Sequence, residues 1–225
     1  MDILFVRNPY PELGLFDIRS FLTAVDEPVT RVLCPTKEGL LGDKLTAFPP
    51  NTTGIPYASG KELEIAKQLF DVGVLFDSVE DIPKIRKAFN TIAALELAYR
   101  GKDCFTSEDV LMDIFSTSVL IGIRGSTSPQ EFAELAWGFK KMAAFVFSGY
   151  FTIDSAVLCA SKAACLAGLI RNDSGDFVRY KHGQDISALS IEAEDFNKLN
   201  KVKKTSPEAF YYFFEALRLF GYENI

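Results

Sequence analysis

The sequence predicts an α+β protein that is predominantly α-helical, in which a short N-terminal β segment precedes a bundle of about seven helices. Strand-like runs bounded by prolines lie within residues 1–35. After Pro35 the apolar residues recur at helical spacing. The chain has 225 residues, 48% of them hydrophobic, which is enough to bury a core. We therefore expect a β-containing unit at residues 1–35 and a helical bundle domain at residues 36–225.

Two runs near the N-terminus have the composition of β-strands. Asp2–Val6 (DILFV) is followed by the breakers Asn8 and Pro9, and Pro28–Cys34 (PVTRVLC) is followed by Pro35. Two strands on their own do not make a stable sheet. We expect these two strands to pair with each other and pack on helices, or to be what remains of a larger sheet.

The first two helices have recognisable start signals. Thr36 is the expected cap of a helix over Glu38–Phe48. Ser59 and Glu62 have the spacing of a capping box, which predicts a second helix that runs to Phe76. The proline- and threonine-rich run between the two helices predicts a loop.

The later helices are predicted by the same reasoning. Ser128 as a cap, Pro129 at the first helical position and Glu131 at the third predict one helix start, and Ser206 with Pro207 predicts another. Residues 172–205 are polar and irregular, and we expect no more than one short helix there. The expected helical ranges in this part are 81–100, 107–123, 129–148, 153–171 and 207–220.

Charge and cysteine content argue against several function classes. The net charge of −6 argues against broad, non-specific binding of nucleic acid. The basic run at 198–204 (KLNKVKK) is expected to be a solvated face or loop. The four cysteines lack metal-binding spacing, and His182 is the only histidine, so a structural zinc site is not expected. Cys159 and Cys165 lie on an alanine-rich helix, where we expect them to serve packing.

The compartment follows from what the sequence lacks. No signal peptide opens the chain, and no run reaches the about 18 apolar residues of a membrane span. Unpaired thiols are typical of a reducing compartment. We expect a cytoplasmic protein without a membrane partner, and the sequence does not set its oligomeric state.

Lys44 lies in the middle of the apolar face of the first predicted helix, EGLLGDKLTAF. At about 100° per residue, Lys44 falls between Leu40 and Phe48, and Asp43 falls on the edge of that face. The ammonium of Lys44 either snorkels over the core to water, or meets a buried carboxylate or a ligand phosphate. Burial without a partner would be too costly. The spacing leaves both alternatives open.

The second predicted helix presents an i,i+4 pair, Lys67 and Asp71. Both lie opposite an apolar arc that includes Ile65 and Leu69. The spacing predicts an exposed ion pair worth about 0.3–0.5 kcal/mol.

Three segments taken together, DILFVRNPYP, PTKEGLLGDKLTAF and EIAKQLFDVGVLFD, resemble the nucleotidyltransferase toxins of the AbiEii/AbiGii abortive-infection family. The resemblance is clearest over residues 1–77. It implies an N-terminal nucleotidyltransferase domain, of which residues 1–35 would be a remnant, followed by a helical bundle. It further implies transfer of a nucleotide from an NTP to an acceptor such as RNA, with Mg²⁺ and the NTP as cofactors and a cognate antitoxin protein as a partner.

The resemblance assigns roles to five residues. In the acidic-Lys-x-x-Ala pattern beginning at Asp43, Lys44 would contact the nucleotide's phosphates, with Asp43 beside it at the nucleotide. In KQLFD, Lys67 would lie near the nucleotide, and Asp71 would orient Lys44 or act near the acceptor. Gln68 and Phe70 stand where the family's pattern has an aspartate and a tyrosine. Asp2 matches the strand that bears the third metal-binding carboxylate.

One departure limits the activity that the resemblance implies. The family's Gly-Ser turn and Asp-x-Asp strand, which hold the metal ions, are not found before Asp2. The late Gly125-Ser126 is not followed by Asp-x-Asp, and we interpret it as an unrelated loop. We therefore expect this chain alone to be inactive and to bind neither Mg²⁺ nor NTP by itself. It would then be a truncated enzyme, or one half of an enzyme that another polypeptide completes.

The alternative is a non-catalytic helical binding module for a protein partner or a nucleic acid. An unrelated hydrolase has little support, because no G-x-S-x-G motif occurs and His182 lies in a polar loop.

Overall fold

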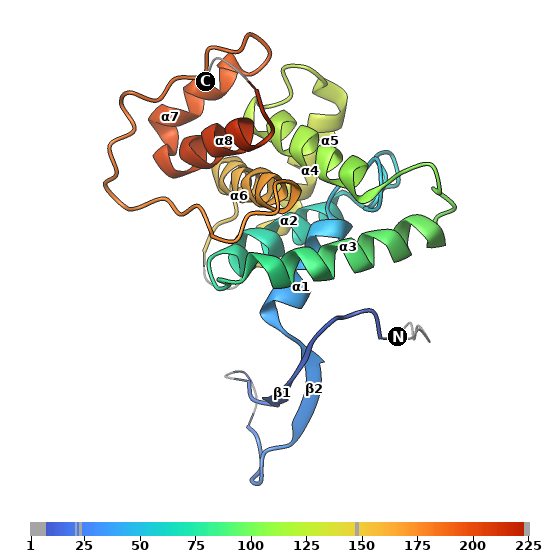
Figure 1. Cartoon of the computed structure of the whole chain (residues 1–225). Coiled ribbons are helices and arrows are strands. Elements are labelled where there is room, and N and C mark those ends of the chain that lie inside the picture. Colours follow the sequence, from blue (N-terminus) through green and yellow to red (C-terminus); the bar gives the residue numbers. More distant parts are fainter. Residues whose placement is uncertain (1–7, 21, 23, 147–148, 223–225) are drawn as a thin grey trace.

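The computed structural model describes residues 8–20, 22, 24–146 and 149–222 (Figure 1). A β-hairpin extends from one side of a body of packed helices, which confirms the predicted class, α+β and predominantly α. Each predicted helix is present, with bounds that differ by a few residues. The elements are β1 (Leu13–Asp17), β2 (Arg31–Pro35), α1 (Lys37–Ala47), α2 (Glu62–Phe76), α3 (Ile82–Tyr99), α4 (Ser107–Gly122), α5 (Pro129–Met142), α6 (Ile153–Arg171), the 3₁₀-helix η1 (Asn197–Lys201), α7 (Val202–Thr205) and α8 (Pro207–Leu219).

The hairpin differs from the prediction in its first strand. β2 overlaps the predicted strand at 28–34, but its partner is β1, which pairs with it antiparallel from Leu13↔Pro35 to Asp17↔Arg31. The predicted strand Asp2–Val6 lies outside the described residues. The sequence did not suggest β1 because Gly14 interrupts the run, and glycine weakens a strand signal.

Of the two predicted side-chain caps, the one at the start of α1 is present and the one at the start of α2 is not. The Thr36 hydroxyl accepts a hydrogen bond from the Gly39 amide at 3.2 Å, so the predicted cap of α1 is confirmed. The predicted capping box from Ser59 is wrong, because α2 begins at Glu62 after Lys61, with no side-chain cap. Gly60 has a φ of +71°, so the chain turns between Ser59 and the start of the helix.

The fifth predicted helix is shorter than expected. α5 begins at Pro129 as predicted but ends at Met142, whereas the pattern predicted a helix to residue 148. The amides of Ala144 and Phe145 bond to carbonyls three residues back, which tightens the end of the helix and turns the chain away. Within 172–205, η1 and α7 follow one another directly and form the one short helical segment that the pattern allowed.

The core is organised around α6, which packs against α2, α4 and α8 (Figure 1). α6 is long and apolar enough to span a membrane by length and composition, contrary to the expectation that no such run exists. Its most apolar window is 72% buried within the protein, because α6 is the central helix of the bundle. Cys165 is fully buried there and Cys159 packs against the core, which confirms their packing role.

Candidate functional site

Lys44 and Asp71 meet where α1 packs against α2. The Lys44 ammonium lies 2.9 Å from a carboxylate oxygen of Asp71. The side chains remain 31% and 38% exposed, so the pair lies at the margin of the core with access to solvent. The structure lies between the two alternatives that the spacing left open: the ammonium has a carboxylate partner, but both side chains are partly exposed and not buried. Each charge is compensated without being sealed from a ligand.

Lys67 has a different partner from the one predicted. Its ammonium lies 2.9 Å from a carboxylate oxygen of Glu64, one turn earlier on α2, and 4.7 Å from the ring centre of Phe145. The predicted i,i+4 pair with Asp71 is therefore wrong, because Asp71 is paired with Lys44 of the neighbouring helix. A cation above an aromatic face is itself stabilised, which explains why Lys67 turns toward Phe145.

Asp43 precedes Lys44 in the sequence, but its carboxylate contacts different residues from those that Lys44 contacts. Its carboxylate accepts a hydrogen bond of 2.7 Å from the Tyr10 hydroxyl, which joins the segment before β1 to α1. Burial, reinforced by the hydrogen bond to Asp43 and its negative charge, raises the pKa of Tyr10. Asp43 also lines a hollow of about 230 Å³ together with Glu96 of α3 and Arg100, which caps the end of that helix. The structure thus brings Lys44 and Asp71 together, places Asp43 in a separate set of contacts, and leaves Asp2 outside the described residues.

The loop between α1 and α2 is held by a buried carboxylate that the sequence analysis did not identify. Asp113 of α4 is 7% exposed and accepts hydrogen bonds, each 2.8 Å long, from the amide and side chain of Asn51 and from the amide and hydroxyl of Thr52. The ammonium of Lys102 donates to the carbonyls of the same two residues, at 2.8 and 2.7 Å. The signal that could have identified Asp113 is a charged residue on the apolar face of a predicted helix. The same signal identified Lys44.

This loop also fixes the end of α1. The Thr53 hydroxyl donates to the Thr46 carbonyl at 2.6 Å. At Gly54 an added Cβ would lie 2.7 Å from the Ala47 carbonyl oxygen and 2.5 Å from that of Pro49, so only glycine allows the chain to fold back this closely. The position of Lys44 relative to α2 therefore depends on the loop as well as on helix packing.

The chemistry available at this site is charge recognition. An ammonium has three donors, so Lys44 can bond Asp71 and still donate to a phosphate oxygen. Lys44 therefore fits the phosphate of the NTP that the resemblance implies. The described part of the chain contains no group of three His, Cys, Asp or Glu side chains that could hold a metal ion. The described residues therefore do not provide the carboxylate cluster that a pair of Mg²⁺ ions would need.

Comparison with known proteins adds no family to this description. No protein-family model, curated protein or solved structure matches the chain. The similarity to the AbiEii/AbiGii toxins stays a prediction, carried by the residues quoted for it. What the structure adds to that prediction is the contact between Lys44 and Asp71.

Proposed function

We propose that this chain carries the phosphate-contacting half of a nucleotidyltransferase site of the AbiEii/AbiGii type. In the intact architecture such a site transfers a nucleotide from an NTP to an acceptor such as RNA. The observation that supports the proposal is the 2.9 Å contact between Lys44 of α1 and Asp71 of α2, at the margin of the core. A lysine held by one carboxylate and still exposed is suited to meet a second anion.

The geometry of the pair supports a role for each residue. Asp71 restrains the Lys44 side chain, so that less rotamer freedom is lost when a phosphate binds. Lys44 donates to a phosphate oxygen and offsets part of its negative charge. The rest of the triphosphate charge would be neutralised by Mg²⁺ held by the other half of the intact architecture, and not by the described residues of this chain. Because the described residues offer no three-ligand cluster for it, the chain alone is expected to bind NTP weakly and to show no turnover.

Binding and turnover test this proposal separately. The affinity of the purified chain for ATP is measured by calorimetric titration and compared with that of Lys44→Met. We expect a dissociation constant about tenfold higher for Lys44→Met, corresponding to the loss of about 1.4 kcal/mol of binding free energy. Lys37→Met is the matched control, because Lys37 is an exposed lysine at the start of the same helix. Equal affinities for the chain and Lys44→Met would refute the role of Lys44.

Turnover is measured by incorporation of radiolabelled nucleotides into total tRNA. We expect no incorporation by the chain alone. Clear incorporation by the purified 225-residue chain would show that the metal-binding half is present after all.

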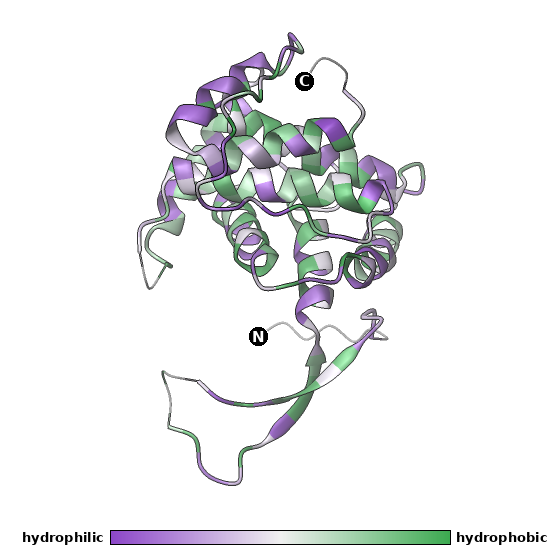
Figure 2. Ribbon diagram, turned by 60° about the vertical axis from the view of Figure 1, so that its left-hand side comes forward, coloured by the Kyte–Doolittle hydropathy of each residue, from purple (hydrophilic) through white to green (hydrophobic). Residues whose placement is uncertain are grey.

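A second candidate function, a binding module for a protein partner such as an antitoxin, is favoured by the hairpin. Leu15 and Leu33 are cross-strand neighbours and are 59% and 67% exposed. Figure 2 shows apolar residues along the strands that project from the helical body. Exposed apolar strands with open edges are common docking sites for other polypeptides.

Substitution of the two leucines tests this candidate. With Leu15→Ser and Leu33→Ser together, a complex with a candidate antitoxin, followed by size-exclusion chromatography with light scattering, is expected to be lost. The melting temperature should not fall, because both side chains are exposed. Val74→Ser with Leu95→Ser is the matched control, since these apolar side chains are 53% and 51% exposed on helices. A complex that survives loss of the hairpin leucines would rule out the hairpin as the docking surface.

A further inference from the structure

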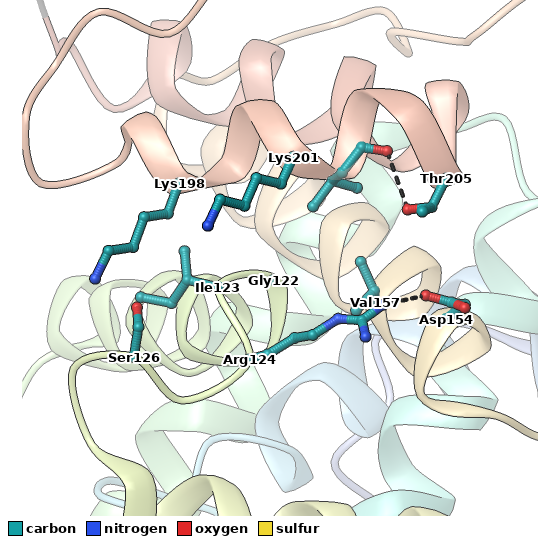
Figure 3. Close-up of a pocket in the computed structure, with 10 residues that line it drawn as sticks. Gly122, Ile123, Arg124, Ser126, Asp154, Val157, Lys198, Lys201 and Thr205 are labelled. Carbon is teal, nitrogen blue, oxygen red and sulfur yellow. Dashed lines mark hydrogen bonds and ion pairs between the residues drawn. The ribbon is translucent and has the colours of Figure 1, made fainter.

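A cleft of about 470 Å³ lies between the end of α4, the first turn of α6 and the η1–α7 segment (Figure 3). In Figure 1, α7 and α1 lie at opposite ends of the helical body, so this cleft is separate from the Lys44–Asp71 pair. Its lining includes parts of two features that the sequence analysis left without a function: Lys198 and Lys201 of the basic run, and Ser126 of the Gly125-Ser126 turn. The cleft is lined by Gly122, Ile123, Arg124, Ser126, Asp154, Val157, Lys198, Lys201, Val202 and Thr205.

The charged groups of the cleft are mostly cationic. Lys198 and Lys201 extend from η1 toward the turn after α4, and the Arg124 guanidinium reaches in from that turn (Figure 3). Asp154 is the one carboxylate among the lining residues, and it lies 2.6 Å from Arg124. Within the described part of the chain, neither Lys198 nor Lys201 has a carboxylate within ion-pairing distance. A chain with a net charge of −6 thus concentrates positive charge at this cleft.

The backbone at Arg124 is held in an unfavourable conformation. Arg124 has a φ of +52° and follows Ile123, the C-cap of α4, at the position where helices usually place glycine. Gly125 follows at φ +74°, and an added Cβ there would lie 2.3 Å from Phe132, so α5 holds this turn in place. A side chain other than glycine or asparagine in this conformation is destabilising. Such strain is concentrated at functional positions, and here it places a guanidinium at the cleft.

The remaining walls of the cleft are apolar. Ile123, Val157 and Val202 line it beside the cationic groups. The volume falls within the range of about 300–1,000 Å³ typical of small-molecule sites, which combine an apolar lining with a few placed polar groups. We propose that this cleft binds a nucleotide-sized phosphorylated ligand. Its phosphate is held by Lys198, Lys201 and Arg124, and its less polar part rests on the three aliphatic side chains. Arg124 has five donors, so it can bond Asp154 and a phosphate at once.

Calorimetric titrations with AMP, inorganic phosphate, adenosine and a short single-stranded RNA test this proposal. AMP is expected to bind more tightly than inorganic phosphate, because the aliphatic wall contributes, and more tightly than adenosine, which lacks the phosphate. The double variant Lys198→Ala, Lys201→Ala is expected to raise the dissociation constant for AMP at least about tenfold. Circular dichroism melting of the variant verifies folding, since both lysines are exposed.

Two control variants make the result specific to the cleft. Lys204→Ala removes an exposed charge from the same basic run without altering the lining, and should leave AMP affinity unchanged. Lys37→Ala, at an exposed lysine of α1 outside the cleft, should also leave it unchanged. Absence of saturable AMP binding, unchanged affinity in the double variant, or binding of RNA without binding of AMP would each overturn the proposal.

Discussion

The Lys44 ammonium and the Asp71 carboxylate, from different helices, lie 2.9 Å apart, and each side chain is about one-third exposed. A fully buried pair would lack access to a ligand, and a fully exposed pair would be loosely oriented. At this intermediate exposure the ion pair contributes little to the free energy of folding, because solvent screens the attraction between the two charges. The pair is therefore better suited to orient the lysine than to hold α1 on α2.

A double-mutant cycle measures how much the pair stabilises the fold. Lys44→Met and Asp71→Asn, made singly and together, are expected to give a coupling free energy of unfolding of about 1 kcal/mol or less. Urea denaturation at neutral pH provides the free energies. A coupling of several kcal/mol would mean that the pair is a structural element of the α1–α2 contact.

Loss of the Asp113 carboxylate should destabilise the protein far more. Asp113→Ala leaves the buried amide of Thr52 and the side chain of Asn51 without acceptors. We expect the free energy of unfolding to fall by about 2–4 kcal/mol. Asp109→Ala is the comparison on the same helix, because Asp109 is exposed and bonds only within its own helix start. Similar losses for the two variants in urea denaturation would contradict the anchoring role of Asp113.

Gly73 permits the close approach of α2 to α6. In an open helix, Gly→Ala raises stability by about 0.5–1 kcal/mol. Here an added Cβ would lie 2.3 Å from the Cys159 sulfur, so we expect Gly73→Ala to lower stability by about 1–3 kcal/mol. Gly175→Ala meets no atom within 4 Å and should have little effect. The two variants are compared by thermal unfolding, and a more stable Gly73→Ala protein would show that the helices can separate freely.

Stability should decline at alkaline pH in part through Tyr212. Burial raises the pKa of Tyr212 to about 12. Because the folded-state pKa exceeds the unfolded value of 10.0, the contribution of Tyr212 to stability is fully present below pH 10 and is lost as pH rises toward 12. Tyr212→Phe should therefore show a shallower fall in the free energy of unfolding above pH 10 than the unmodified protein. Parallel alkaline profiles in urea denaturation would show that the hydroxyl does not titrate with unfolding.

The strain at Arg124 can be measured by comparing two substitutions. Arg124→Ala and Arg124→Gly both remove the guanidinium and its ion pair with Asp154. Only glycine relieves the φ of +52°, so Arg124→Gly should be about 1 kcal/mol more stable than Arg124→Ala. The difference is read from urea denaturation, while AMP affinity should fall equally in both. Equal stabilities would show that the turn relaxes without cost.

Features set by near neighbours in the chain were largely predictable from the sequence. The Thr36 cap and the Pro129 helix start rest on interactions within one turn of helix, and both are present. The apolar face around Lys44 was likewise visible from spacing. Local pattern failed where the backbone turns: α5 ends at Met142, before the predicted residue 148, and α2 begins without a side-chain cap after the turn at Gly60.

The sequence by itself thus determined the fold class, the order of the helices and the presence of a charged residue on an apolar face. Only the tertiary structure decided the partners: Lys44 with Asp71, Lys67 with Glu64, and Asp113 with a loop 62 residues away at Asn51. It also decided that Lys198 and Lys201 share a cleft with Arg124. The physical reason is that helix periodicity fixes the direction of a side chain from its own axis. Which group it meets depends on how that axis packs against the others.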